Sequence, residues 1–129
     1  MKVVRQALTT AMATIALGAA LTVGGGAAAS ATTEACPGSP NHDANGEGYG
    51  LVVGVHSLRT GPSVECSAKN NLPSGTKVWL WCYVTNSSHH TWWWVREADQ
   101  ANSGWMYEGN MTVYEYDDNG NGHWDARHC

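Results

Sequence analysis

The C-terminal segment of the chain alternates oxygen-bearing side chains with glycine. The oxygen donors are Asp117, Asn119, Asn121, the main-chain carbonyl of His123, and Asp125. Oxygen ligands spaced in this way hold Ca²⁺ in loops of the EF-hand type. The twelfth position is His128 instead of the usual bidentate glutamate, and no helix is expected on either side. The segment therefore predicts either a structural calcium loop or a glycine-rich turn without metal.

The remaining polar residues do not form a catalytic pattern. His89 and His90 are adjacent, and neighbouring residues of an extended chain face opposite sides, which does not suit a structural zinc site. A serine hydrolase needs an exposed nucleophile with a placed base, whereas Ser63 lies in a turn without such a motif. The neighbouring carboxylates Asp117 and Asp118 have no evident pocket. We expect a protein that is not an enzyme and that requires no cofactor.

The four cysteines indicate disulfide bonds, because their number is even and none forms a Cys-x-x-Cys pair. Four cysteines allow three pairings, which the sequence alone does not separate. We favour Cys66 with Cys82, which would tie a turn to a central strand. Cys36 with Cys129 would then join the two chain ends, which lie close together in many small domains.

Residues 1–31 have the features of an export signal. Lys2 and Arg5 precede an uncharged stretch from 7 to 23, and Ala29-Ser30-Ala31 is a small-x-small cleavage site. The alternative is a membrane anchor, but the apolar run is shorter than the ~20 residues of a spanning helix. We expect cleavage after residue 31 and a secreted protein, extracellular or associated with the cell wall, with no membrane partner.

The charge of the chain argues against nucleic acid as a partner. The full sequence has a formal net charge of −4, and the export signal contains two basic residues and no acidic one. Its removal makes the remaining chain more acidic, which is unfavourable for binding phosphates. Residues 32–129 suffice for one small domain with a modest core, so covalent cross-links are expected to stabilise it.

The pattern of the mature chain predicts an all-β protein of about five short strands. Residues 32–50 are rich in Gly, Pro, Asn and Asp and predict a flexible lead-in held at Cys36. No helical period is long enough to propose a helix. Turn residues at 59–63 and 73–75, and a hairpin loop at 86–90, separate the predicted strands. The strands are expected at 51–56, 77–85, 91–96, 104–107 and 111–116.

Aromatic residues alternate through the central predicted strands. In segment 77–85, Val78, Leu80, Cys82 and Val84 are predicted to share the core face, opposite Trp79, Trp81 and Tyr83. Tryptophan offers a flat apolar surface and an indole N–H, which suits sugars, proline-rich peptides or a partner protein. The alternative is that a chain without phenylalanine fills its core with tryptophan. We expect a ligand-binding groove formed by Tyr83, Trp92, Trp94 and Tyr107.

Four short motifs follow one another between residues 51 and 113. They are Arg-x-Gly-Pro-Ser at 59–63, Leu-x-x-Gly at 72–75, Trp-x-x-Val at 92–95, and Gly-Trp-Met at 104–106. In this order they resemble the bacterial SH3-like domain family, in its secreted single-domain form. The resemblance implies a small SH3-like β-barrel at 51–113, followed by a C-terminal tail at 114–129. The two cysteines at 66 and 82 and the three consecutive tryptophans depart from the family pattern.

The resemblance also implies a function, because members of this family often bind peptidoglycan peptide or glycan. We therefore expect a non-catalytic binding module for a cell-wall component. Two alternatives remain open: an interaction or inhibitor-like protein with one extracellular protein target, and a structural protein without a dedicated ligand. The sequence does not indicate an oligomeric state.

Overall fold

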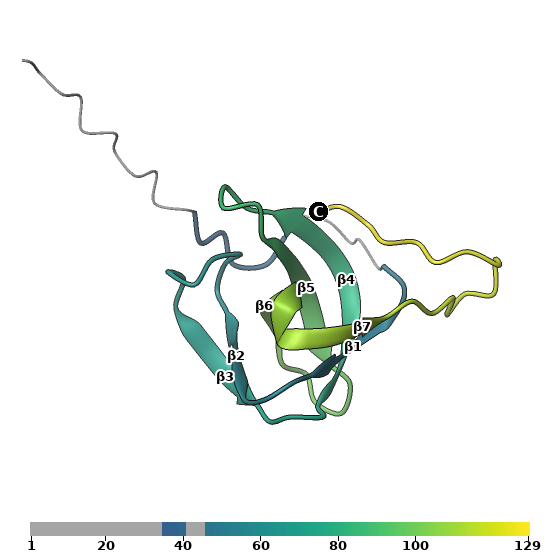
Figure 1. Cartoon of the computed structure of the whole chain (residues 1–129), viewed down its shortest axis with the longest axis horizontal. Helices are drawn as coiled ribbons and strands as arrows, with labels where there is room; N and C mark the ends of the chain where they lie inside the picture. The colour runs from purple at the N-terminus through teal and green to yellow at the C-terminus, as the bar shows by residue number, and fades with distance from the viewer. Residues whose placement is uncertain (1–34, 41–45) are drawn as a thin grey trace, which may run out of the picture. The chain divides into compact units, whose positions relative to one another are not determined.

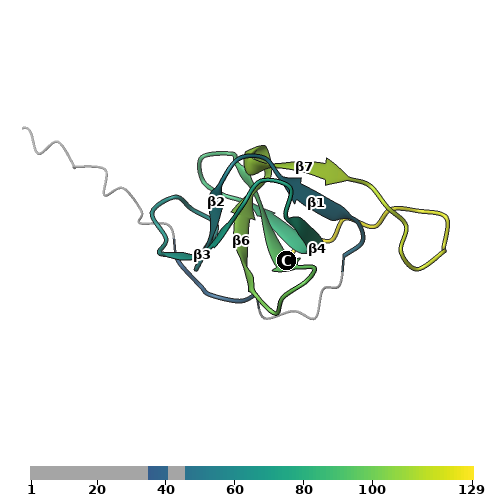
Figure 2. The same cartoon turned by 90° about the horizontal axis from the view of Figure 1, so that it is seen from below.

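The protein is an all-β fold with one antiparallel sheet of seven strands, as seen in the computed structural model (Figures 1 and 2). The structure describes residues 35–40 and 46–129, so the predicted export signal lies outside the described residues. The strands are β1 (Tyr49–Val52), β2 (His56–Arg59), β3 (Ala68–Leu72), β4 (Lys77–Thr85), β5 (Thr91–Glu97), β6 (Ser103–Tyr107) and β7 (Met111–Tyr114). A short 3-10 helix, η1 (Glu108–Asn110), precedes β7. Their order in the sheet is β3-β2-β6-β5-β4-β1-β7.

The sequence predicted about five strands, and the two additional ones have clear physical causes. The predicted strand at 51–56 is interrupted by Gly54, whose φ of 85° is a conformation that glycine adopts readily. Its first two residues lie in β1 and its last residue, His56, begins β2. Strand β3 is polar and exposed along most of its length, so it lacks the alternation by which strands are recognised in sequences.

Strands β4 and β5 form the longest hairpin of the sheet, and β4 contains a bulge at Trp81. Leu80 pairs with Val95 and Cys82 pairs with Trp94, so the register shifts by one residue between them. A bulge reverses the alternation of side chains beyond it. Leu80 accordingly packs in the main core, whereas Cys82 packs on the opposite face of the sheet. The prediction that these two residues share a face was wrong for this reason.

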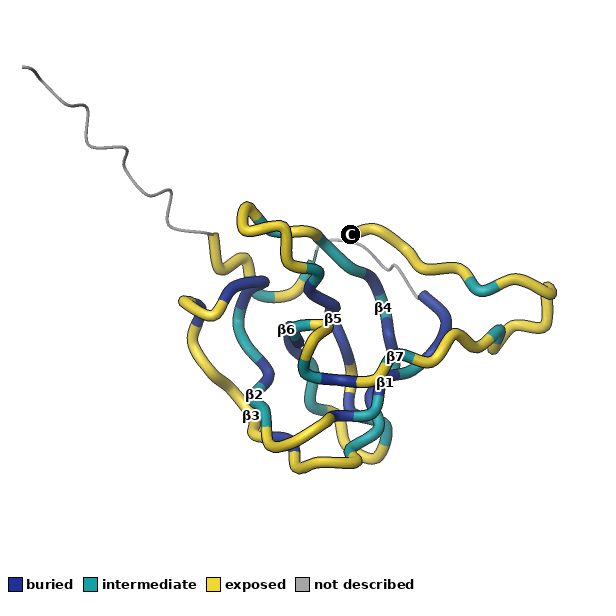
Figure 3. The backbone as a smooth tube through the Cα atoms, viewed as in Figure 1, coloured by how far each residue is buried: buried dark blue, intermediate teal, exposed yellow. Residues whose placement is uncertain are grey.

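The main core lies on one face of the sheet. It consists of Val52, Leu58, Leu72, Val78, Leu80, Trp93, Val95, Met106 and Met111. Buried residues are frequent along β4 and β5 (Figure 3). Gly104 allows β6 to approach β2 closely, because a Cβ atom at this position would lie 2.7 Å from Cβ of Leu58. Burial of these apolar side chains supplies the dominant favourable term for folding.

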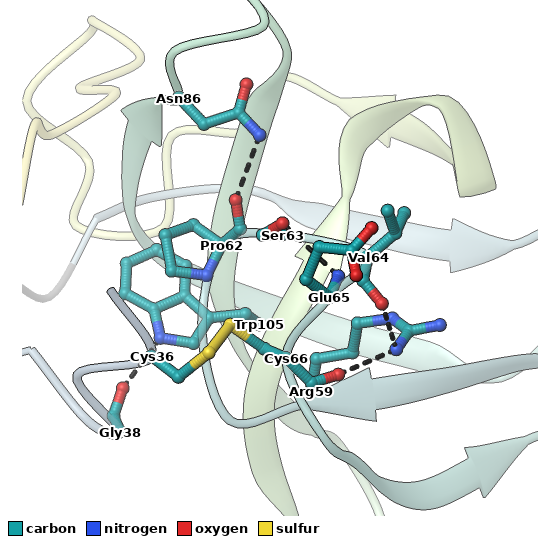
Figure 4. Close-up of a disulfide and its surroundings, with 10 residues drawn as sticks. All are labelled: Cys36, Gly38, Arg59, Pro62, Ser63, Val64, Glu65, Cys66, Asn86 and Trp105. Atoms are coloured by element: carbon teal, nitrogen blue, oxygen red, sulfur yellow. Dashed lines mark hydrogen bonds between the residues drawn. A yellow bond between two sulfur atoms is a disulfide. The ribbon is translucent and has the colours of Figure 1, made fainter. Parts of the chain in front are cut away.

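A second apolar cluster, which we call the outer cluster, lies on the other face and comprises Cys82, Trp92, Trp94 and Trp105. The lead-in segment contacts this cluster, since Nε1 of Trp105 donates a hydrogen bond of 2.6 Å to the carbonyl of Gly38 (Figure 4). Trp105 is only 2% exposed. The lead-in thus contributes to folding the domain and is not simply a tether.

The two disulfides join Cys36 to Cys66 and Cys82 to Cys129. The prediction of disulfides is confirmed, but the predicted pairing of Cys66 with Cys82 and of Cys36 with Cys129 was wrong. The turn after β2 brings Cys66 against the lead-in, and a Cβ atom on Gly61 would lie 2.6 Å from Cα of Cys36. The bulge turns Cys82 toward the outer cluster, where Cys129 packs.

The C-terminal segment leaves the sheet after β7 as a long loop and returns beside β4 (Figure 1). Tyr83 donates its backbone N–H to the carbonyl of Arg127 at 2.8 Å and accepts one from Cys129 at 2.9 Å. These bonds place Cys129 beside Cys82, the neighbour of Tyr83, and so explain the disulfide between the two cysteines. Two disulfides are compatible with an extracellular protein. Within residues 35–40 and 46–129, no helix has the length and apolar character to cross a membrane.

Candidate ligand-binding groove

An open groove of about 590 Å³ lies between the β4–β5 hairpin loop and the segment from β6 to β7. Its lining residues are His89, His90, Thr91, Tyr107, Glu108, Gly109, Met111, Thr112 and Val113. Aromatic, hydroxyl and carboxylate groups are all represented, whereas no lysine or arginine is among these lining residues. Concave surfaces with an apolar wall and a few polar groups are typical of ligand sites.

Asn86 holds the hairpin loop that forms one wall of the groove. Its side-chain oxygen accepts backbone N–H groups from Ser88 at 3.1 Å and from His90 at 3.0 Å. Its side-chain nitrogen donates to the carbonyl of Pro62 at 3.0 Å, which connects the loop to the turn after β2 (Figure 4). His89 has a φ of 62°, a value uncommon for a residue other than glycine. The loop is therefore fixed by specific hydrogen bonds.

The opposite wall is formed by the end of β6 and by η1. The ring of Tyr107 lies 5.1 Å from that of His90 and 5.7 Å from that of Trp92, measured between centroids. The carboxylate of Glu108 accepts a hydrogen bond of 2.7 Å from Nε1 of Trp93. The buried indole thus fixes one oxygen of a carboxylate at the groove surface. This arrangement suits a ligand that offers an apolar face together with an amine or hydroxyl group.

The structure separates the four aromatic residues that the sequence placed in one groove. Tyr107 lines the groove. Trp92 contacts the ring of Tyr107 but is itself only 2% exposed. Trp94 is 8% exposed and packs against Trp105. Tyr83 contacts Trp93 and His128, because the bulge turns it toward the main core. The expectation of an exposed surface does not hold for Trp92 and Trp94, because the lead-in and the tail pack against the outer cluster that contains them.

Sequence reasoning did not select His89, His90 and Glu108 as groove residues. The pattern predicts only a hairpin loop that contains the two histidines and does not suit zinc, and Glu108 lies outside every motif. The sequence signal that could have indicated the two histidines as groove residues is their position in a hairpin loop directly before the three consecutive tryptophans. The partner segment, Glu108–Asn110, becomes recognisable only when β6 is paired with β5.

The Asp117–Asp125 loop is ordered by hydrogen bonds to its own side chains. Asp117 accepts backbone N–H groups from Gly120, Asn121 and Gly122, the shortest two at 2.6 Å. The bond from Gly122 is the main cause that lowers the pKa of Asp117 below its ordinary value of 3.8. The stabilisation that this carboxylate provides is present above that ordinary value and is lost as the pH falls through the lowered pKa.

The far end of this loop is fastened to the buried residue Glu47. Nε1 of Trp124 donates to the carbonyl of Glu47 at 2.9 Å, and the N–H of Asp125 donates to its carboxylate at 3.1 Å. Glu47 is 3% exposed. Within the described residues, no group of three or more His, Cys, Asp or Glu side chains is placed to hold a metal ion. Calcium at this loop stays a prediction.

Comparisons with known proteins identify no relative whose site could be compared with the groove. No protein-family model, curated protein or solved structure matches the chain. The function is therefore inferred from the chemistry of the surface described above.

Proposed function

We propose that the chain is a secreted, non-catalytic binding module with an SH3-like fold, which holds a short segment of cell-wall peptide or glycan in the groove. The observation that supports this function best is the contact between the rings of His90 and Tyr107, one from each wall, together with the anchored carboxylate of Glu108. Aromatic rings bind the apolar faces of sugars and peptide side chains. The carboxylate accepts hydrogen bonds from amine or hydroxyl groups, which such polymers carry.

The charge of the surface supports the same class of ligand. No lysine or arginine lines the groove, and the full chain has a formal net charge of −4. A groove of this kind disfavours polyanions such as nucleic acids. It favours neutral polymers and peptides that carry a free amine. A single extracellular protein is the alternative partner, and the experiment below separates the two.

The proposal predicts that His90→Ala reduces retention of the oxidised mature protein on purified cell wall by about tenfold, the typical effect of truncating a central contact. His90 is exposed, so the substitution should leave the thermal midpoint nearly unchanged. Wall sedimentation with quantification of the supernatant measures the effect. Val64→Ser is the matched control, since Val64 is 66% exposed and lies outside the groove lining.

Equal retention of both variants would contradict a role for the groove. If the unmodified protein stayed entirely in the supernatant, wall binding would be contradicted and a protein target would be favoured. Glu108→Gln provides a second readout. Glutamine keeps an oxygen acceptor for Trp93 but removes the charge, so it tests the need for the carboxylate.

We also propose that the Asp117–Asp125 loop binds a structural calcium ion through the oxygen donors predicted from the sequence. Trp124 lies within the loop and is half-buried against Glu47, so its excitation should sensitise Tb³⁺ bound in place of Ca²⁺. Saturable terbium emission is expected, and Asp117→Asn should weaken it by about tenfold. Asp118→Asn is the control, because Asp118 lies outside the alternating donor set. Emission that does not saturate, or that responds alike to both substitutions, would contradict the site.

A further inference from the structure

A row of aromatic side chains crosses the sheet on the face opposite the main core. Tyr114 of β7 pairs with Tyr49 of β1, Tyr49 pairs with Trp79 of β4, and Trp79 pairs with Arg96 of β5. Residues paired in this way project from the same face of an antiparallel sheet. Their neighbours Gly50, Val78 and Val113 pack toward the main core, and the row therefore lies on the outer face. We call Tyr114, Tyr49 and Trp79 the aromatic row.

The rings of this row contact one another closely. The ring of Tyr49 stacks on that of Tyr114 with centroids 4.9 Å apart and planes inclined by 14°. It makes edge contacts with Trp79 at 6.2 Å and with Tyr116 at 6.4 Å. Tyr114 and Tyr116 remain 40% and 54% exposed. Contiguous exposed aromatic surface is a feature of interaction sites.

Two cations flank the row at Trp79. Nζ of Lys77 lies 4.1 Å from the ring centroid of Trp79 and 4.2 Å from that of Tyr49. Arg96 is exposed and stands directly opposite Trp79 in the sheet. In the part of the chain that the structure describes, neither cation forms an ion pair with a carboxylate. This concentration of positive charge is unusual in a chain with a negative net charge.

Two other basic residues, Arg59 and Lys69, have structural partners instead. Arg59 donates to the carbonyls of Val64 and Cys66 (Figure 4), and Lys69 donates to the carbonyl of Ser103. Lys77 and Arg96 have no such hydrogen bonds among the described residues. Their charges are therefore available to an external anion. The row thus offers aromatic contact area and positive charge on one face.

We propose that the aromatic row binds a carboxylate-bearing sugar residue of a polysaccharide. The exposed tyrosine rings would contact the C–H groups of the sugar, and Lys77 and Arg96 would bind its carboxylate by charge-assisted hydrogen bonds. Charge complementarity selects an acidic polysaccharide over a neutral one. The row shares no residue with the groove lining, so this second site goes beyond the proposed function and does not depend on it.

The test uses the oxidised mature protein and an oligogalacturonide, with the methyl-esterified oligomer as the uncharged control. Isothermal titration is expected to show saturable binding to the acid form and at least tenfold weaker binding to the ester. Lys77→Gln and Arg96→Gln should each weaken binding to the acid form by about tenfold. Arg127→Gln removes an exposed cation of the C-terminal tail, where the backbone pairs with Tyr83 and not with the row, and should have no effect.

Circular dichroism verifies that each variant is folded. Trp79→Phe serves as a folding control, because it keeps an aromatic side chain at this position. Equal binding of acid and ester, or equal effects of Lys77→Gln and Arg127→Gln, would overturn the proposal. Self-association that is abolished by Tyr114→Ser would also overturn it and would assign the row to contact between copies of this chain. Since His90→Ala leaves the row intact, failure of the groove and failure of the row are distinguishable.

Discussion

Replacing Trp105 with alanine is expected to lower the free energy of unfolding by about 3–5 kcal/mol, the usual range for a fully buried tryptophan. Trp105 is 2% exposed, packs against Trp94 at 5.6 Å between centroids, and donates a hydrogen bond to Gly38. The substitution removes the contact that joins the lead-in to the outer cluster. Urea denaturation followed by circular dichroism measures the change.

Trp105→Phe separates the two contributions of this side chain. Phenylalanine keeps most of the apolar volume but has no N–H, so it should cost about 1 kcal/mol for the lost hydrogen bond, with a further contribution from repacking. Val64→Ser again serves as a neutral surface control. A loss below about 1 kcal/mol for Trp105→Ala would show that the outer cluster is not closed by the lead-in.

Removal of the Cys82–Cys129 disulfide by a double substitution to alanine is expected to lower stability by about 4 kcal/mol. The bond joins residues 47 positions apart, and the chain-entropy model gives this magnitude for a loop of that length. Removal of Cys36–Cys66, which joins residues 30 positions apart, should cost about 3.5 kcal/mol in the same model. Urea denaturation of the two double variants tests both values.

The connectivity itself can be tested by peptide mapping without reduction. Cross-linked peptides that contain Cys36 with Cys66 and Cys82 with Cys129 are expected. A peptide that joins Cys66 to Cys82 would contradict the structure and would support the pairing inferred from the sequence. A fully reduced protein that unfolds at the same urea concentration as the oxidised one would contradict the predicted stabilisation.

The sequence predicted the fold class and the central hairpin because their signals are local. The segment at 77–85 alternates apolar residues, and its bounds agree with those of β4. The turn at 73–75 and the loop at 86–90 contain residues that favour turns. Strand β3 could not be predicted, because it has four exposed positions and is specified by pairing with β2.

The sites were harder to predict than the strands because they depend on register. One bulge at Trp81 decides that Cys82 faces the tail and that Tyr83 faces the main core. Tyr49 and Tyr114 stack although they are far apart in the sequence, and no local pattern relates them. Tertiary pairing therefore determines which aromatic residues are covered and which remain exposed.

The strand order also bears on how the protein behaves at high concentration. Strands β3 and β7 are the two ends of the sheet, and each leaves backbone groups that another chain could pair with. Strand β3 presents Lys69, Asn70 and Asn71 there, a charged and polar edge that disfavours aggregation. The last residue of β7 is Tyr114, whose side chain is exposed. Fibril-like assembly, under destabilising conditions, should therefore start from the β7 edge.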